Sequence, residues 1–328
     1  MPRWSVGNVW GSFFERLAVE VAVQRKVIQL LILSVLWPLC WVANGQTMTP
    51  SQIRALTGRI PPRPSQALTG SQFAEYVSNM DPQQREQAIL NEVLRGNLPG
   101  FLRKLIPVEL KHVLANGRTL KATIFVMPDY LAVGSDRDFL RIPMNLYTAT
   151  TIIARFGFVL PTKKIVDAIY DQASYHFKPQ PMPAGPQMRS TKYYRIHNQM
   201  IEKQSLARGI PFGELVSGDK KDVVITNLLA RKPDRIAIYG WHRSEGDPIQ
   251  PLSIVHGARY ADYSHGIRLV SDVAIINGEP RSIYGILQDS SLAKVLSDEG
   301  PIRGLWPLTA PPKSLRKRSK LAVLTNDR

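Results

Sequence analysis

The sequence predicts an α+β protein with a mixed or antiparallel sheet, flanking helices and a single main domain. Apolar residues make up 44% of the 328 residues and charged residues 21%, which is an ordinary globular balance. Clusters of β-rich runs alternate with segments of helical period, and this order is typical of the α+β class. Asn-Gly dipeptides at Asn116 and Asn277 mark tight turns beside such runs.

The N-terminal 45 residues resemble a secretory leader. Arg25 and Lys26 precede an apolar run over residues 27–43, and small residues follow it. We expect cleavage after Gly45, and therefore a periplasmic or extracellular location. The alternative is an uncleaved membrane anchor over residues 27–43, although Pro38 and the length of 17 residues are poor for a spanning helix.

The domain proper is expected over residues 79–305. Residues 46–78, which are rich in proline and polar residues, are predicted to be a flexible linker. Asp81 and Pro82 have the pattern of an N-cap and a first helical residue, and Gly96 ends that helix. The final segment, residues 306–328, is basic and is expected to be disordered.

The first half of the domain contains two predicted hairpins and two predicted helices. The hairpins are Val108–Leu114 with Leu120–Met127, and Tyr130–Val133 with Phe139–Ile142. One helix covers Leu146–Phe156 and ends at Gly157, and the next is capped by Thr162.

The second half begins with a proline-rich stretch, residues 178–190, that is predicted to be a loop or an internal boundary. A helix over Tyr193–Arg208 follows it, and Val223–Leu229 is apolar enough for either a strand or a helix. The remaining expected elements are the strands Arg235–Tyr239, Leu252–His256 and Ile267–Ile276 and the short helices Ser282–Leu287 and Ser290–Leu296.

The composition and motif content of the chain exclude or disfavour several classes of function. The only cysteine, Cys40, lies in the leader, so the domain has no disulfide, thiolate nucleophile or cysteine metal ligand. The formal net charge of +16 becomes +14 without residues 1–45, and such a chain is attracted to anionic polymers of the cell envelope. Nucleic acid is disfavoured, because no helix-turn-helix, zinc-finger or RNP pattern is found. Nucleotide-dependent enzymes are disfavoured by the lack of a P-loop or GxGxxG motif.

The densest candidate site is the segment 239–265. It holds three of the six histidines, His242, His256 and His265, each near the end of a predicted strand. Antiparallel pairing of neighbouring strands would bring these ends together, with Asp262 and Tyr263 beside His265.

Two chemistries fit this set of side chains. In one, His242, His256, His265 and Asp262 bind Zn²⁺, and the metal activates a water molecule. In the other, His256 or His265 transfers a proton without a metal, Asp262 orients it and Tyr263 stabilises charge. A purely structural role, in which these groups hydrogen-bond a loop, is the third reading.

Four further residues are expected to bind substrate. These are Trp241, Arg259, Arg268 and Lys220. The arginines would hold a carboxylate, the lysine an anion, and the tryptophan a sugar ring. The hypothesis is an exported hydrolase of an envelope or extracellular polymer. The alternatives are a non-catalytic binding module for an acidic glycan, lipid or other polyanion and, with an uncleaved leader, a membrane-anchored structural protein.

Two resemblances accompany these residues. Ser264-His265 with Asp272 resembles the first zinc motif of D-Ala-D-Ala carboxypeptidases, but Arg268 replaces the usual glycine and no histidine follows His265. The runs YADYSHGIRLV at 260–270 and KKDVVITNLLA at 220–230 are similar to a family of exported bacterial proteins of unassigned activity. This second resemblance spans about residues 80–305, and it implies an exported domain without a stated reaction.

Overall fold

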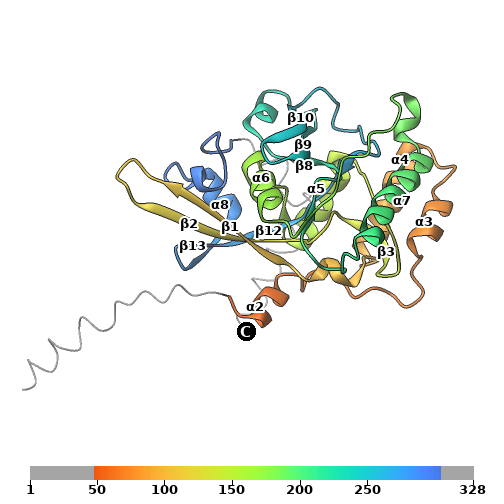
Figure 1. Cartoon of the computed structure of the whole chain (residues 1–328), viewed down its shortest axis with the longest axis horizontal. Coiled ribbons are helices and arrows are strands. Elements are labelled where there is room, and N and C mark those ends of the chain that lie inside the picture. The colour runs from red at the N-terminus through yellow and green to blue at the C-terminus, as the bar shows by residue number, and fades with distance from the viewer. Residues whose placement is uncertain (1–47, 304–328) are drawn as a thin grey trace, which may run out of the picture. The chain divides into compact units, whose positions relative to one another are not determined.

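The computed structural model describes residues 48–303 (Figure 1). The predicted leader, with Cys40, and the predicted basic tail lie outside the described residues. Within 48–303, no helix is long and apolar enough to cross a membrane. The α+β class is confirmed, because helices surround antiparallel and mixed sheets. The α-helices are α2 (Pro50–Ala55), α3 (Gly70–Tyr76), α4 (Pro82–Leu94), α5 (Leu146–Phe156), α6 (Lys163–Gln172), α7 (Thr191–Ala207) and α8 (Ile283–Gln288).

The larger sheet has the strand order β14-β13-β2-β12-β5, and β1 also pairs with β2. All of its pairings are antiparallel. The long β1–β2 hairpin projects from one side of the molecule (Figure 1). The strands of this sheet are β1 (Ile106–Val113), β2 (Thr119–Val126), β5 (Phe158–Val159), β12 (Val270–Ser271), β13 (Val273–Ile276) and β14 (Glu279–Ser282).

A second sheet has the order β10-β9-β8-β11 and carries most of the predicted site segment. Its strands β8, β9 and β10 pair antiparallel, whereas β11 pairs parallel with β8, so this sheet is mixed. Its strands are β8 (Lys221–Val224), β9 (Ala237–Ser244), β10 (Asp247–Ser253) and β11 (His265–Gly266). Two further pairs are β3 (Ala132–Ser135) with β4 (Asp138–Arg141) and β6 (Tyr175–His176) with β7 (Val216–Ser217).

The predicted strand order around the histidines differs from the structure. The expected strand Ile267–Ile276 is divided into β12 and β13 of the larger sheet, and His265 lies in the separate strand β11. β10 ends at Ser253; it is an irregular edge strand that contains Pro248 and Pro251, and proline is tolerated at a sheet edge because it has no N–H to donate. His256 therefore lies in the loop after β10, and β10 and β11 are at opposite edges of their sheet.

Residues 48–78 are packed helical structure where a flexible linker was expected. Capping boxes begin α2 at Thr49 and α3 at Thr69, and Phe73 and Val77 are fully buried. The Arg63 side chain also donates hydrogen bonds to Asn97 and to the Gly134 carbonyl. The T-x-x-Q pattern of these caps indicates the start of a helix, but the proline content of the segment was given more weight in the prediction.

Three α-helices begin at the N-caps that the sequence indicates, whereas the short helix expected over Ser290–Leu296 is only the 3₁₀ turn Ala293–Val295. The Asp81 side chain caps α4, Asn145 caps α5 and Thr162 caps α6. Gly157 ends α5 in the left-handed region at φ 80°, where glycine is favoured. The proline-rich stretch 178–190 is a loop that ends in a 3₁₀ turn, Pro186–Arg189, and it does not divide the domain.

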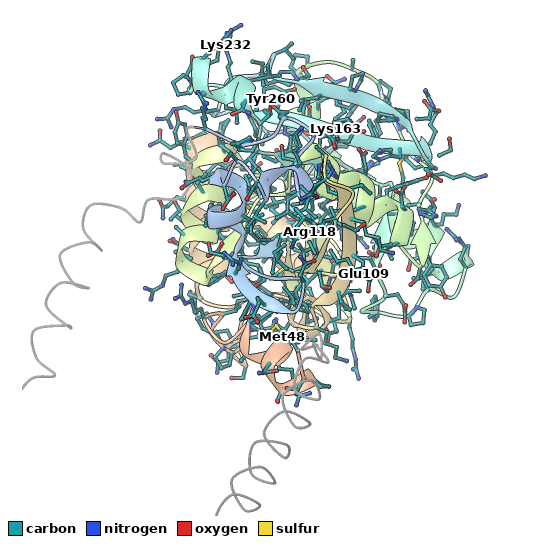
Figure 2. All side chains as sticks on the ribbon, turned by 90° about the vertical axis from the view of Figure 1, so that its left-hand side faces the viewer. Met48, Glu109, Arg118, Lys163, Lys232 and Tyr260 are labelled. Atoms are coloured by element: carbon teal, nitrogen blue, oxygen red, sulfur yellow. The ribbon has the colours of Figure 1, made fainter. Side chains whose placement is uncertain are left out.

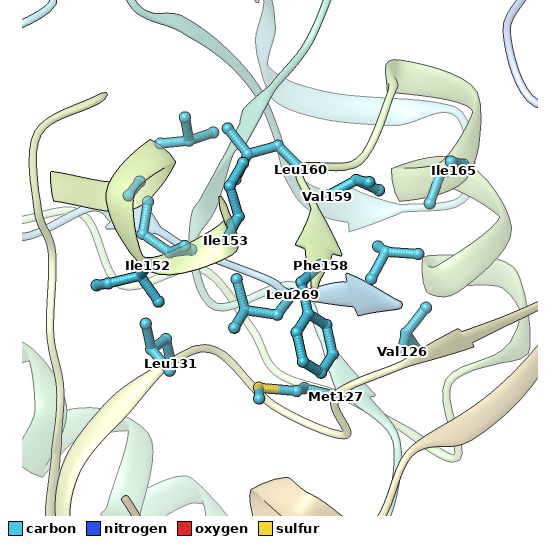
Figure 3. Packing of buried hydrophobic residues seen from close by; sticks show 14 of the residues in the cluster. Val126, Met127, Leu131, Ile152, Ile153, Phe158, Val159, Leu160, Ile165 and Leu269 are labelled. Atoms are coloured by element: carbon cyan, nitrogen blue, oxygen red, sulfur yellow. The ribbon is translucent and has the colours of Figure 1, made fainter. Parts of the chain in front are cut away.

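The hydrophobic core lies between α5, α6 and the larger sheet. Figure 3 shows side chains of α5 and α6 meeting those of β5 and of the chain beside β2 and β12. The labelled members are Val126, Met127, Leu131, Ile152, Ile153, Phe158, Val159, Leu160, Ile165 and Leu269, all of them buried. This core fixes β12, which continues the chain from β11 and therefore positions His265.

Candidate functional site

His256, Tyr260, Asp262 and His265 form one group of side chains, which we call the His256 cluster. The His256 ring stacks on Tyr260 with 4.1 Å between centroids and 9° between planes. The His265 ring is 6.1 Å from His256 and 5.6 Å from Tyr260. The prediction that His256 and His265 meet is therefore confirmed, although they do so through a loop and not across paired strands.

Backbone hydrogen bonds hold both histidines in place. The His256 carbonyl accepts from Ile236 N–H, and the next residue, Gly257, bridges Arg235. His265 lies opposite Lys221 in the parallel pair of β11 and β8. The loop between the histidines is thus anchored to the smaller sheet at each end, which gives a defined geometry to the side chains it carries.

Asp262 is the only carboxylate of the His256 cluster. Its oxygens accept hydrogen bonds from Ser264 N–H at 2.8 Å, Ser264 O–H at 2.6 Å and Tyr260 O–H at 3.0 Å. Its Oδ2 lies 3.9 Å from His265 Nε2. Burial raises the pKa of Asp262, but the His265 imidazole, the bonds from Ser264 and the charge of Lys221 together bring that pKa below its usual value. Asp262 is therefore ionised at neutral pH.

The two histidines are both neutral at pH 7 but differ in exposure. Burial lowers the pKa of His265 to about 4, although Asp262 opposes this, and neither ring nitrogen of His265 has a hydrogen-bond partner among residues 48–303. Burial also lowers the pKa of His256, again against the effect of Asp262. Because His256 is only half-buried, it presents an unprotonated imidazole to solvent.

Lys220 belongs to a buried group with His197, Trp241 and Tyr263. Its Nζ donates to the Tyr263 carbonyl at 2.6 Å and contacts His197 Nδ1 at 3.1 Å. The His197 ring lies 5.0 Å from Tyr263 and 6.1 Å from Trp241. Burial lowers the pKa of Lys220 to about 7, and only 1% of the residue is exposed.

Three of the expected substrate-binding residues are therefore internal. Lys220 and Trp241 are buried in this group, and a buried side chain does not reach a polymer on the surface. Arg268 is fully buried as well, with its guanidinium donating to the Met127 and Val216 carbonyls and lying 4.2 Å from the Tyr130 ring. These residues hold the interior together instead of binding a carboxylate.

Tyr263 was expected to stabilise charge in the reaction, but it too is a buried residue that holds the interior together. Its hydroxyl accepts from Met182 N–H at 2.7 Å, so it fastens the proline-rich loop to the segment that carries Asp262. The residue is 1% exposed. Tyr260, which stacks on His256, is the tyrosine that the structure places in the His256 cluster.

His242 is separate from the His256 cluster. Its Nε2 lies 3.3 Å from Asp167 Oδ1, and its ring stacks on Tyr170 at 4.5 Å. His242 also lines a cavity of about 410 Å³, together with Asp171 and Glu245. Among residues 48–303, no group of three or more His, Cys, Asp or Glu side chains is arranged to hold a metal ion. The four zinc ligands predicted from the sequence are thus not brought together.

Asp272 likewise does not join His265 as the carboxypeptidase resemblance implied. Its carboxylate accepts from the Ser282 hydroxyl and from Tyr284 N–H at the start of α8. Asp272 lies between β12 and β13 of the larger sheet, whereas His265 is in the smaller one.

Comparison with protein-family models, with curated proteins and with solved structures gave no match. The activity therefore has to be inferred from the side chains themselves.

Sequence reasoning missed a buried ionic network around Arg141. The Arg141 guanidinium donates to both carboxylate oxygens of Asp129 and, at 2.5 Å, to Glu202. Asp219 lies 3.8 Å from Arg141, and burial followed by the Asp129 charge raises the pKa of Asp219 to about 6. These residues are far apart in sequence, so no local pattern could have indicated the network.

The structure also adds Arg189, which sequence reasoning did not single out. Its guanidinium carbon lies 5.4 Å from the Tyr260 ring, and the residue is exposed. Arg259, an expected substrate-binding residue, is exposed too and lies over the Tyr147 ring at 5.0 Å. Both arginines line one cavity beside the His256 cluster.

Proposed function

We propose that the chain is a hydrolase of esters or amides in which His256 is the general base. The observation that carries this proposal is the half-buried His256 ring, stacked on Tyr260 whose hydroxyl is bound to the Asp262 carboxylate. A base needs a neutral imidazole that a substrate and water can reach, and His256 meets both needs.

The proposed reaction uses one water molecule. His256 accepts a proton from the water as its oxygen bonds to the carbonyl carbon. The protonated His256 then gives that proton to the leaving alcohol or amine as the C–O or C–N bond breaks. Burial lowers the pKa of His256, but the negative charge of Asp262 acts in the opposite direction. Asp262 therefore favours the imidazolium that forms between these steps.

Two neighbouring residues support this chemistry. Tyr260 holds the His256 ring in one orientation, because its own hydroxyl is fixed on Asp262. The Arg189 guanidinium lies over the Tyr260 ring and keeps a positive charge close to the cluster. Since the cluster has one carboxylate and glycoside hydrolysis ordinarily uses two, an ester or amide is the better substrate class.

Export and an envelope or extracellular polymer as substrate belong to the same proposal. They are supported by the basic flank and apolar run before residue 45 and by the net positive charge. N-terminal sequencing of protein recovered outside the cytoplasm is the direct test of export. A mature chain that starts near residue 46 is expected.

Hydrolysis is tested with a small chromogenic ester, p-nitrophenyl acetate, and its anilide counterpart. We compare the intact chain with His256→Gln and with His112→Gln, a half-buried histidine on β1. His256→Gln should lower kcat about 10²- to 10⁴-fold, the usual contribution of a general base. His112→Gln should retain full activity, and circular dichroism checks that both variants fold.

Two outcomes would overturn the proposal. One is an intact protein that cleaves neither compound faster than free imidazole does. The other is a folded His256→Gln variant as active as the intact chain.

A further inference from the structure

The cavity beside the His256 cluster has a volume of about 500 Å³ and opens to solvent. Its wall is shared by α4, α5 and the loops that carry Arg189 and Arg259. Arg189 connects it to the cluster, because its guanidinium lies over Tyr260 and Tyr260 stacks on His256. The Leu146 N–H donates to the Ala258 carbonyl and ties the start of α5 to the same loop.

Arg189 and Arg259 form no ion pair and donate no side-chain hydrogen bond to the described part of the chain, residues 48–303. Each guanidinium lies against a tyrosine ring, which limits its motion and leaves its N–H edge free. A free, planar guanidinium is suited to bind an oxyanion through two parallel hydrogen bonds.

The one carboxylate that lines the cavity does not neutralise these arginines by direct pairing. Glu86 accepts hydrogen bonds from Asn145 N–H at 3.0 Å and from the Thr148 hydroxyl at 2.6 Å. The N-terminal turns of α4 and α5 also line the cavity, but the Asp81 carboxylate already caps α4 and Glu86 already binds the Asn145 N–H, so the two arginines supply the unpaired positive charge. The cavity therefore favours a ligand with negative charge.

The other lining groups indicate what carries that charge. Tyr147 is 48% exposed and offers an apolar ring face, while Gln83 and Gln87 supply exposed amides. An aromatic face with amides and arginines matches a sugar ring that bears hydroxyls and an acid group. The volume is also much greater than a lone inorganic anion requires.

We propose that this cavity binds an acidic saccharide unit, with Arg189 and Arg259 on its carboxylate or sulfate. This inference rests on the hydrolase proposed above, since it places the anionic sugar of the polymer beside the ester or amide that His256 acts on. The cavity thereby assigns a substrate class, an acidic glycan carrying acyl groups.

Binding is measured by calorimetry on the full chain, independently of hydrolysis. The probes are a galacturonic acid trisaccharide, the uncharged galactose trisaccharide and a sulfated galactose trisaccharide. The variants are Arg189→Gln and Arg259→Gln, with Arg118→Gln as the matched control. Arg118 is exposed beside the β1–β2 turn, and Figure 2 shows it well apart from Tyr260.

We expect an acidic trisaccharide to bind at least tenfold tighter than the uncharged one, with affinity that falls as salt is added. Arg189→Gln and Arg259→Gln should each weaken binding about tenfold or more, and Arg118→Gln should not. Preference for the carboxylated or the sulfated probe identifies the acid group. Equal affinity for the uncharged probe, no binding of any probe, or equal binding by all three variants would overturn the inference.

These results separate the two proposals. Arginine-dependent binding without any ester or amide cleavage leaves the saccharide site in place and removes the hydrolase. The protein is then the binding module for an acidic glycan that the sequence offered as the alternative. Cleavage that needs His256, in a protein that binds no acidic saccharide, removes only the saccharide site.

Discussion

Replacing Lys220 by methionine should change the stability of the fold in a pH-dependent way, because Lys220 supplies hydrogen bonds in the interior and is itself buried. The substitution keeps most of the side-chain volume but removes the donor to the Tyr263 carbonyl and to His197 Nδ1. A buried polar group left without its partner costs about 1–3 kcal/mol. Two such groups would cost about 2–6 kcal/mol in the free energy of unfolding, but methionine also avoids the cost of taking the Lys220 ammonium out of water, and this opposes the loss.

The effect should also depend on pH with a definite sign. Burial lowers the pKa of Lys220 from its ordinary 10.5 to about 7 in the folded chain. Between these two values the unfolded chain binds a proton that the folded chain does not, so the intact protein gains about 1.4 kcal/mol per pH unit from this group. The methionine variant lacks this gain, and the loss it shows should therefore be larger at pH 9 than at pH 7.

Urea unfolding followed by tryptophan fluorescence measures both quantities. Lys221→Met is the matched control, because Lys221 is only partly buried and its ammonium lies 5.4 Å from the Trp241 ring. That contact accounts for about 1 kcal/mol. An effect of Lys220→Met that is constant between pH 7 and 9, or that changes no more over this range than the effect of Lys221→Met, would refute this account of Lys220.

Three other predictions concern the interior and the proposed base. Arg141→Met should lower the free energy of unfolding by about 3–5 kcal/mol, since it leaves Asp129 and Glu202 without their partner, and a loss below about 1 kcal/mol in urea would contradict this. Gly266→Ala should cost about 1–3 kcal/mol, because a Cβ there would lie 2.5 Å from Tyr130 Cδ1, whereas Gly285→Ala has room and should leave the melting temperature unchanged or higher. The acid limb of kcat/KM should have an apparent pKa below 6.5, with the rate falling as His256 is protonated, and a midpoint above 6.5 would show that another group titrates.

The elements that local chemistry determines were predictable from the sequence. The Asn116-Gly117 turn lies between β1 and β2 as expected, and Gly157 ends α5. Such signals depend on a few adjacent residues, so one sequence suffices to find them. The single strand expected over Ile267–Ile276 was wrong, because tertiary pairing divides that run into β12 and β13 of the larger sheet, and no local pattern marks the division.

The candidate site was predictable only in part. His256, Asp262 and His265 do meet, since they lie within one anchored loop. His242 was misplaced because its strand β9 directs it to Asp167 on α6, a contact between residues far apart in sequence. Lys220 was expected to bind an anionic substrate, whereas tertiary contacts with His197 and Tyr263 bury it. His197 carried a usable signal, because it shares the buried face of α7 with Tyr194 and Ile201 at helical spacing.

The chain passes directly from β11 in the smaller sheet to β12 in the larger one within a few residues. His265 and Asp262 stand at the start of this short crossing, and Arg268 within it is clamped by the Met127 and Val216 carbonyls. Because this segment between β11 and β12 is so short, a shift of one sheet against the other would have to distort its backbone. Backbone amides here should exchange with deuterium as slowly as those of the deepest strands, because they open only when the fold as a whole opens.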